Sequence, residues 1–164
     1  MTTPPSMDQI IAAVRRLEGV LVLQPRAGDG TPELAWGDAF FYYAPDGQVP
    51  TAVQPYGTVV TKNYPDDVSC DLDRPDRWRV NVHVGRDRLR ALVGDRGPER
   101  AVVPDVFLPH PLYGDLGWVC VVNPGERTGR RVVELLHEAH DAARRRSERR
   151  RSLGAPVRPA DPAR

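Results

Sequence analysis

Histidine is the side chain best suited to acid–base chemistry in this sequence, and His110 stands in the most constrained context. It lies between Pro109 and Pro111, in a Pro-His-Pro-Leu-Tyr run that ends at Tyr113. Prolines fix the backbone around an imidazole that titrates near neutral pH, which positions a general acid or base at low entropic cost. A structural turn explains the same run equally well. His110 is therefore the first candidate for a general base, and His83 is the second.

The segment 78–84 shows the clearest alternation of apolar and polar residues in the chain. Its apolar residues point one way, whereas Arg79, Asn81 and His83 point the other. On an open, concave sheet face these three side chains form a binding surface. On an outer face they are ordinary solvent-side residues. The alternation predicts the grouping and leaves both interpretations open.

Metal-ligand patterns are weak in this chain. Glu134 and His137 have the Glu-x-x-His spacing of carboxylate-bridged di-iron sites, but such a site needs a second copy on facing helices. His140 does not complete a His-Glu-x-x-His motif, so a solvated helix face is the favoured interpretation. Cys70 and Cys120 show no Cys-x-x-Cys pattern; we expect Cys120 in the core and Cys70 as an exposed loop thiol. We expect no metal and no cofactor.

Signatures of nucleophilic catalysis and phosphate binding are missing. The sequence has no Gly-x-Ser-x-Gly motif, and Gly28-Asp29-Gly30 is followed by Thr and Pro rather than by a phosphate-binding pattern. A hydrolase needs a nucleophile and an oxyanion hole beside its base. An enzyme is therefore the alternative hypothesis, not the leading one.

Six arginines fall within eight residues near the C-terminus, at Arg144, Arg145, Arg146, Arg149, Arg150 and Arg151. Such a cluster can neutralise nucleic-acid phosphates. However, cations also favour the C-terminus of a helix. Lys62 is the only lysine of the chain, so arginine is its usual basic residue. No aromatic residue is interleaved for base stacking. The cluster predicts at most weak, salt-sensitive binding to nucleic acid.

Composition is typical of one globular domain. Of the 164 residues, 40% are hydrophobic and 27% are charged, which suits a domain with a buried core. We expect a disordered lead at 1–5, one domain at 6–151 and a disordered basic tail at 152–164. No apolar run is long enough to cross a bilayer and the N-terminus does not resemble a signal peptide, so a cytoplasmic protein without a membrane partner is expected. The net charge is +1, but residues 144–164 hold eight arginines against two acids, which leaves an acidic body.

Periodicity predicts an α+β fold. A capping box at Ser6 begins a first helix, and helical stripes predict a short helix at 85–94 and a long one at 128–150. Extended patterns predict strands at 20–23, 33–36, 39–44, 56–62, 78–84 and 118–122. Strands outnumber crossover helices, so we expect a curved antiparallel sheet of about five strands with helices packed on one face.

Several short motifs carry a family resemblance: WGDAFFYY at 36–43, VVTK at 59–62, LDRP at 72–75, LPHPLY at 108–113, GWV at 117–119 and NPG at 123–125. Together they resemble a family of small actinobacterial proteins of unknown function, over about residues 6–145. More distantly, the order of elements is similar to that of MmcQ/YjbR-like proteins, which share the α-β(3)-α-β(2)-α plan of secretion-chaperone-like folds. DNA binding has been suggested for that group. The acidic loop at 63–76 is a departure that would repel phosphate.

The leading hypothesis is a non-enzymatic module that binds a small molecule or a protein segment. The candidate ligand-binding residues are the polar strand face and neighbouring loop residues: Arg79, Asn81, His83, Asp38, Lys62, Asp73, Arg74, His110 and Tyr113. The resemblance to chaperone-like folds implies pairing into a homodimer as a further expectation. A small enzyme with His110 or His83 as acid or base, and nucleic-acid binding through the arginine cluster, remain the alternatives.

Overall fold

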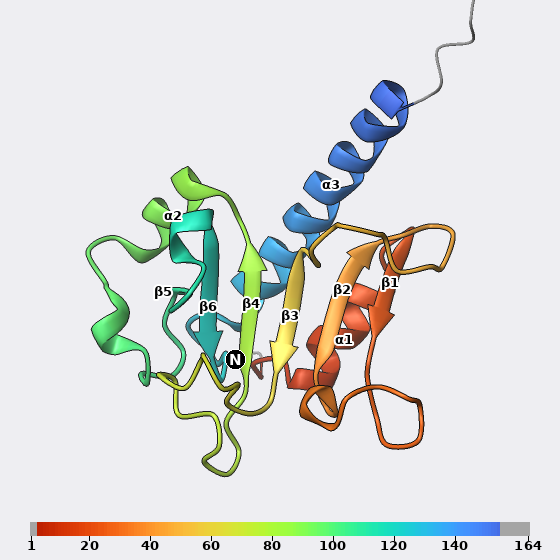
Figure 1. The fold of residues 1–164 in the computed structure, drawn as a ribbon. Helices are drawn as coiled ribbons and strands as arrows, with labels where there is room; N and C mark the ends of the chain where they lie inside the picture. The colour runs from red at the N-terminus through yellow and green to blue at the C-terminus, as the bar shows by residue number, and fades with distance from the viewer. Residues whose placement is uncertain (1–2, 155–164) are drawn as a thin grey trace, which may run out of the picture.

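Runs of β-branched and aromatic residues form one antiparallel sheet. The structure is a computed structural model that describes residues 3–154 (Figure 1). In this range the sheet has six strands: β1 (Val20–Leu23), β2 (Ala39–Tyr43), β3 (Gly57–Val60), β4 (Arg79–His83), β5 (Leu108–Pro109) and β6 (Trp118–Val122). Their order is β1-β2-β3-β4-β6-β5, and every neighbouring pair is antiparallel. The sheet is open, with β1 and β5 at its edges.

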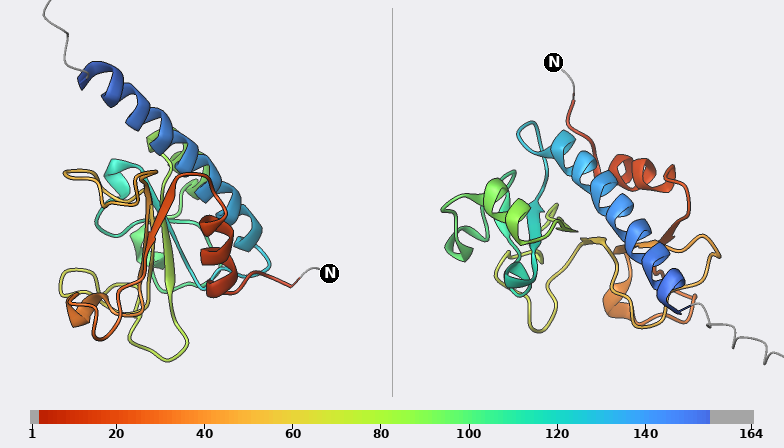
Figure 2. Two further views of the ribbon diagram at one scale, coloured as in Figure 1. Left: turned by 90° about the vertical axis from the view of Figure 1, so that its right-hand side faces the viewer. Right: turned by 90° about the horizontal axis from the view of Figure 1, so that it is seen from above.

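Two helices cover one face of this sheet. α1 (Met7–Arg15) and α3 (Gly129–Gly154) lie on the same side of the strands, as the edge-on view in Figure 2 shows. α2 (Arg86–Val93) contacts β5 and β6 at the other end of the sheet. The capping box is present, because Ser6 Oγ accepts from Gln9 N while Gln9 Oε1 accepts from Ser6 N. The predicted α+β class is confirmed.

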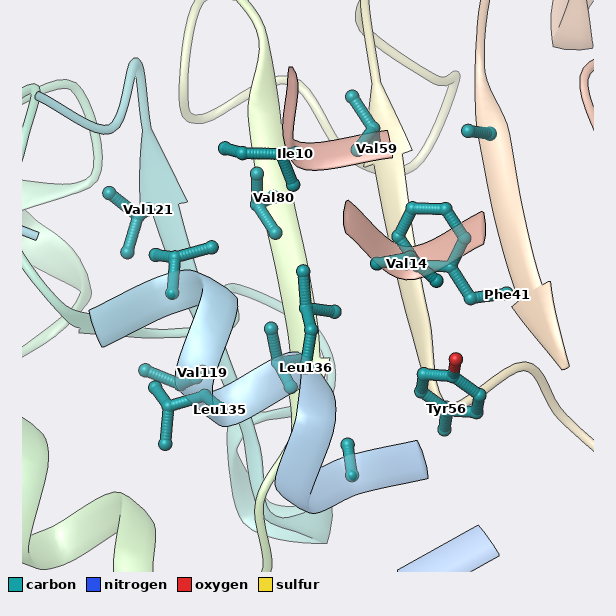
Figure 3. Close-up of a cluster of buried hydrophobic side chains, with 14 of the residues drawn as sticks. Ile10, Val14, Phe41, Tyr56, Val59, Val80, Val119, Val121, Leu135 and Leu136 are labelled. Carbon is teal, nitrogen blue, oxygen red and sulfur yellow. The ribbon is translucent and has the colours of Figure 1, made fainter. Parts of the chain in front are cut away.

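The main hydrophobic core lies between the sheet and these two helices (Figure 3). Val80 and Val82 of β4 point into it from the sheet, and Leu135 and Leu136 of α3 fill it from the helix side. Burying each such side chain contributes about 1.5–3 kcal/mol. The helix approaches β3 so closely that a Cβ on Gly57 would lie 2.7 Å from Leu136 Cδ2, which explains a glycine inside a strand.

The intervening strand residues form the opposite face of the sheet. The register places Phe40 beside Thr58 and Thr58 beside Asn81, so these three side chains form one row across β2, β3 and β4. Arg79 of β4 lies beside Val60 of β3 on this face. Loop residues, rather than α1 and α3, surround the row. The grouping of Arg79 with Asn81 on one face, predicted from the alternation, is confirmed.

Three local expectations are wrong. The expected strand at 33–36 is a 3₁₀ helix, Glu33–Ala35, in which Trp36 N donates to Glu33 O instead of to a neighbouring strand. The sheet has six strands rather than about five, because Leu108–Pro109 pairs with β6; two residues are too few to show alternation in the sequence. Helix α3 continues through Ser152 to Gly154. The rest of the expected tail, and residues 1–2, lie outside the described residues.

Burial also corrects the expectations for four polar side chains. Cys70 is buried rather than exposed, since its loop folds back over β4. His140 is buried too, with its ring nitrogens facing Tyr56 Oη and Glu18 O, so it does not belong to a solvated helix face. Arg79 and Asn81 are 1% and 3% exposed, so β4 is covered on both faces rather than half-buried.

None of the helices in residues 3–154 combines the length and apolar character that a bilayer span requires.

Candidate functional site

A cavity of about 640 Å³ opens on the sheet face that α1 and α3 leave uncovered. We call it the sheet-face cavity. Strand residues line its sheet side, among them Phe40, Tyr42, Thr58, Asn81 and Trp118, and residues from the loops that follow β1, β2, β3 and β5 complete the lining. A cavity of this size matches those that hold drug-sized molecules.

The walls of the sheet-face cavity are mainly apolar and aromatic. Phe40, Tyr42 and Trp118 come from β2 and β6, and Tyr113 comes from the loop after β5. Around the rim, the apolar side chain of Leu116 is 59% exposed. Flat aromatic side chains supply large contact areas at low entropic cost, and exposed apolar groups at a rim commonly mark a binding surface.

Arg79 occupies the polar end of this cavity and is almost fully buried. Its Nη1 donates to Asp67 Oδ1 at 3.0 Å and its Nη2 to Asp67 Oδ2 at 2.5 Å, which forms a bidentate ion pair. Its Nε donates to Asn81 Oδ1 at 2.8 Å, and Asn81 Nδ2 donates to Thr58 Oγ1 at 2.9 Å. This network holds Arg79 in one orientation across two strands.

The ion pair keeps both of its members charged. Burial alone would lower the pKa of Arg79, but the hydrogen bonds and charge of Asp67 outweigh it and raise that pKa above its ordinary value. Burial would likewise raise the pKa of Asp67, yet Arg79 lowers it. A buried charge is stable only when paired in this way. The positive charge of Arg79 at the polar end of the cavity is therefore already balanced by Asp67.

His110 lies beside this pair, between two sets of polar groups. Its Nδ1 accepts hydrogen bonds from the backbone N–H groups of Leu112, at 3.1 Å, and Tyr113, at 3.2 Å. Its Nε2 faces Arg79 Nη2 at 3.2 Å and Asp67 Oδ2 at 3.7 Å. Burial, followed by the charge of Arg79, lowers the pKa of His110 to about 4, so its imidazole is neutral at pH 7.

Two cysteines lie behind Arg79, away from the cavity lining. Arg79 Nη1 is 3.3 Å from Cys70 Sγ, and Cys120 Sγ lies 3.7 Å from Pro109 O. The hydrogen bond from Cys120 is the largest cause that lowers the pKa of Cys70, to about 6; burial opposes it and Arg79 adds to it. The pKa of Cys120 is raised by its contact with Cys70 and by burial. Cys70 therefore contacts Arg79, and neither thiol lines the cavity.

Four other predicted residues do not line the sheet-face cavity. Asp38 is fully buried and accepts from Thr61 N at 2.8 Å and Lys62 Nζ at 3.1 Å, so Asp38 and Lys62 hold β2 against the segment after β3. Asp73 accepts from Asn63 N within its own loop at 2.9 Å. Arg74, on the protein surface, pairs with Asp71. Asp38 does reach the site indirectly, because it accepts from the hydroxyl of Tyr64, a lining residue.

His83 also lies outside this cavity. Its ring is 5.5 Å from that of Trp118, and its Nε2 is 3.1 Å from Leu116 O. Burial, with a smaller contribution from Arg146, lowers the pKa of His83. Of the nine predicted ligand-binding residues, the structure brings Arg79, Asn81, His110 and Tyr113 together.

The arginine cluster lies on the C-terminal half of α3. Arg145 and Arg146 line a second cavity of about 510 Å³, together with Arg88 of α2 and His83. The charge of Arg88 is balanced by Glu138 of α3. Arg144 lies 3.9 Å from Asp141. The remaining members, Arg149, Arg150 and Arg151, are exposed.

Sequence reasoning missed Asp67, Tyr42 and Trp118 as site residues. Asp67 was one of several acids in a long loop, and nothing in its spacing marked it as the partner of Arg79. Tyr42 lies in the aromatic run 36–43, and aromatic residues are as common in cores as in binding sites. Alternation along β2 would have separated Phe40 and Tyr42 from Phe41, since neighbouring strand residues point to opposite faces.

A family model described as a family of unknown function, DUF6194, matches residues 2–152. The chain belongs to the DUF6194 family. The match covers all six strands, the three helices up to Ser152 and the residues that line both cavities. No curated protein and no solved structure matches this DUF6194 chain. The argument for function therefore rests on the geometry of the site.

Proposed function

We propose that this DUF6194 chain is a non-enzymatic binding module that holds a small organic molecule in the sheet-face cavity. One observation carries the proposal: aromatic walls surround a few fixed polar groups, Arg79, Asn81 and His110, at one end of the cavity. Binding sites for small molecules have this composition, in which apolar area supplies affinity and a few polar atoms set orientation. The network around Arg79 is preorganised, so a ligand would not have to order these side chains.

Catalysis receives less support from the same atoms. A general base must present a lone pair to its substrate, but the lone pair of neutral His110 on Nδ1 is used by the amides of Leu112 and Tyr113. His83, the other candidate acid or base, lies outside the cavity. Cys70, which has a lowered pKa, is completely buried behind Arg79.

Other properties predicted from the sequence are further proposals. Nucleic-acid binding would use the exposed arginines of α3, with Arg145 and Arg146 beside the second cavity. The element order supports a distant similarity to MmcQ/YjbR-like proteins, with four strands rather than three before α2. Actinobacterial origin, a cytoplasmic location and a homodimer remain further proposals. In a homodimer, the exposed rim leucines of one copy would cover the cavity of the other.

Binding of the neutral fluorescent probe N-phenyl-1-naphthylamine tests the main proposal. The probe should gain fluorescence on entering an apolar cavity, and Leu116→Asp should weaken its binding at least about tenfold, because a charge at the rim must be desolvated. Leu153→Asp is the matched control: Leu153 is 87% exposed near the end of α3, far along the chain from the cavity lining. This control should bind the probe like the unmodified chain.

Two results would count against the proposal. If Leu116→Asp and Leu153→Asp bind the probe equally well, the probe does not occupy the sheet-face cavity. If sedimentation shows a dimer that Leu116→Asp converts to a monomer, a second copy covers this face, and the homodimer becomes the better account. Native mass spectrometry of gently purified protein adds a direct readout of any retained small molecule.

A further inference from the structure

The polar end of the sheet-face cavity brings a guanidinium nitrogen and an imidazole nitrogen together. Arg79 Nη2 and His110 Nε2 are 3.2 Å apart, which is a hydrogen-bonding distance. A guanidinium only donates, so His110 Nε2 would have to accept for this contact to be a hydrogen bond. The state of Nε2 therefore decides what this pair of atoms can bind.

The backbone assigns the proton of His110 to Nε2. The amides of Leu112 and Tyr113 both donate to Nδ1, so Nδ1 carries the lone pair and a neutral imidazole must carry its hydrogen on Nε2. The opposite tautomer would place an Nδ1–H against two backbone N–H groups. That arrangement creates two donor–donor contacts, with the amides of Leu112 and Tyr113. The tautomer with Nε2–H creates only one, with Arg79 Nη2. The tautomer with Nε2–H is the better solution.

Within the described residues, His110 Nε2–H has no acceptor at hydrogen-bonding distance. Asp67 Oδ2 is the nearest charged oxygen, at 3.7 Å, and it already accepts from Arg79 Nη2 at 2.5 Å. His110 is only 6% exposed, so bulk water reaches it poorly. A buried donor without an acceptor costs free energy, which a ligand acceptor atom within hydrogen-bonding distance of both Nε2 and Nη2 would recover.

The charges of the lining indicate that this acceptor is neutral. Arg79 is the only cationic group among the lining residues, and Asp67 balances it. Asp66 adds a further negative charge at the cavity. A ligand carboxylate would therefore meet a net negative site. A carbonyl oxygen accepts the same two hydrogen bonds without this repulsion, and Asp67 beside it can accept a hydrogen bond from the ligand.

We infer that the ligand is a neutral, planar cyclic amide, whose carbonyl oxygen accepts from His110 Nε2 and Arg79 Nη2 and whose adjacent N–H donates to Asp67. The flat walls formed by Phe40, Tyr42 and Trp118 suit an aromatic ring fused to such an amide. The inference rests on the proposed function, because it assigns a ligand class to the same cavity. It adds a requirement that the apolar walls alone do not impose: one acceptor next to one donor.

Three probes of similar shape test this requirement: quinolin-2(1H)-one, its 1-methyl derivative and 2-naphthoate. The first has the acceptor and the donor, the second has only the acceptor, and the third is an anion. Titrations followed by two-dimensional amide NMR give affinities and locate each probe. Quinolin-2(1H)-one should bind about tenfold or more tightly than either of the others, which corresponds to one hydrogen bond to a charged group.

Two substitutions of His110 separate its roles as a ligand donor and as a turn former. In His110→Asn the amide oxygen reaches the position of Nδ1 and keeps the backbone hydrogen bonds, but no donor replaces Nε2. In His110→Gln the amide nitrogen reaches the position of Nε2. The cyclic amide should lose about tenfold in affinity for the Asn variant and retain most of it for the Gln variant. Thermal unfolding of both variants checks that the domain remains folded.

Each contrary result has a distinct meaning. If 2-naphthoate binds the cavity most tightly, or if methylation of the amide nitrogen has no effect, the inferred ligand class is wrong while the binding-module proposal stands. If His110→Asn binds the cyclic amide as tightly as the unmodified chain, His110 Nε2 is not a ligand donor and the inference fails. If none of the three probes perturbs cavity resonances while N-phenyl-1-naphthylamine still binds there, the inferred ligand class is wrong and the binding module stands; if that probe also fails to bind, both are overturned.

Discussion

The two faces of the sheet share the same strands but are held together by different interactions. On the helix side, Val80 and Val82 of β4 pack against α3 and form an apolar core. On the cavity side, the same strand presents Arg79 and Asn81, which are just as deeply buried. Apolar packing needs only matching shapes, whereas buried polar groups need a specific partner for each hydrogen bond.

This difference shows how the fold makes room for a site. Helices α1 and α3 contribute rows of apolar side chains that fill the helix side, as Figure 3 shows. The cavity side is covered by loops, which bring single residues such as Asp67 and His110 to the strands from distant parts of the chain. Loops leave space between these residues, and the sheet-face cavity occupies that space. The helix side therefore supplies the apolar core, whereas the cavity side leaves the space in which the proposed ligand would bind.

Loss of Arg79 should be the most damaging change on the cavity side. Arg79→Met leaves the carboxylate of Asp67 buried without its partner and should lower the free energy of unfolding by about 3–5 kcal/mol. Adding Asp67→Leu should recover most of that loss, because replacing both members of a buried ion pair with apolar groups is often nearly neutral. Urea unfolding followed by circular dichroism measures both variants.

The helix side supplies the control for this experiment. Leu136→Ala should cost about 2–5 kcal/mol through the cavity that it leaves in the core. In contrast to the Arg79 variant, no second truncation nearby should restore that stability. If the double variant of Arg79 and Asp67 is as unstable as the sum of the two single variants, an unpaired charge is not the reason for the loss.

Acid should weaken the cavity side through His110. Its pKa is 6.5 in its ordinary state and about 4 in the folded chain, so the unfolded chain binds a proton at a higher pH than the folded one. The stabilisation is thus complete above pH 6.5 and is lost as the pH falls towards 4, by about 3 kcal/mol in all. Unfolding free energies measured across this pH range should show the decline, and His110→Asn should flatten it.

His137→Asn provides the comparison on α3. His137 is exposed on α3, so its substitution removes one histidine without changing the cavity side. A residual decline is expected in His110→Asn, since burial also lowers the pKa of His83 and of His140. If the His110→Asn and His137→Asn profiles coincide, burial and the charge of Arg79 do not hold His110 in its neutral form.

The sequence predicted the helix side better than the cavity side, for a physical reason. Apolar periodicity is a local property, so the buried faces of α3 and β4 could be recognised from spacing alone. The partnership of Arg79 with Asp67 depends on how a loop returns to the sheet, and no local pattern encodes it. The prediction of an exposed Cys70 was wrong for the same reason: its polar sequence neighbours indicated exposure, whereas the folded loop buries it.

A second arginine–carboxylate pair tests how much burial matters to the first. Arg88 of α2 donates through Nη2 to both carboxylate oxygens of Glu138 in α3, at 2.9 Å each, and the two side chains are 42% and 51% exposed. Water and salt screen such a pair, and Glu138→Gln should change the unfolding free energy by less than about 1 kcal/mol. The change should shrink further in 1 M salt, while the effect of Arg79→Met should persist. A loss as large as that of Arg79→Met would mean that geometry, rather than desolvation, sets the strength of both pairs.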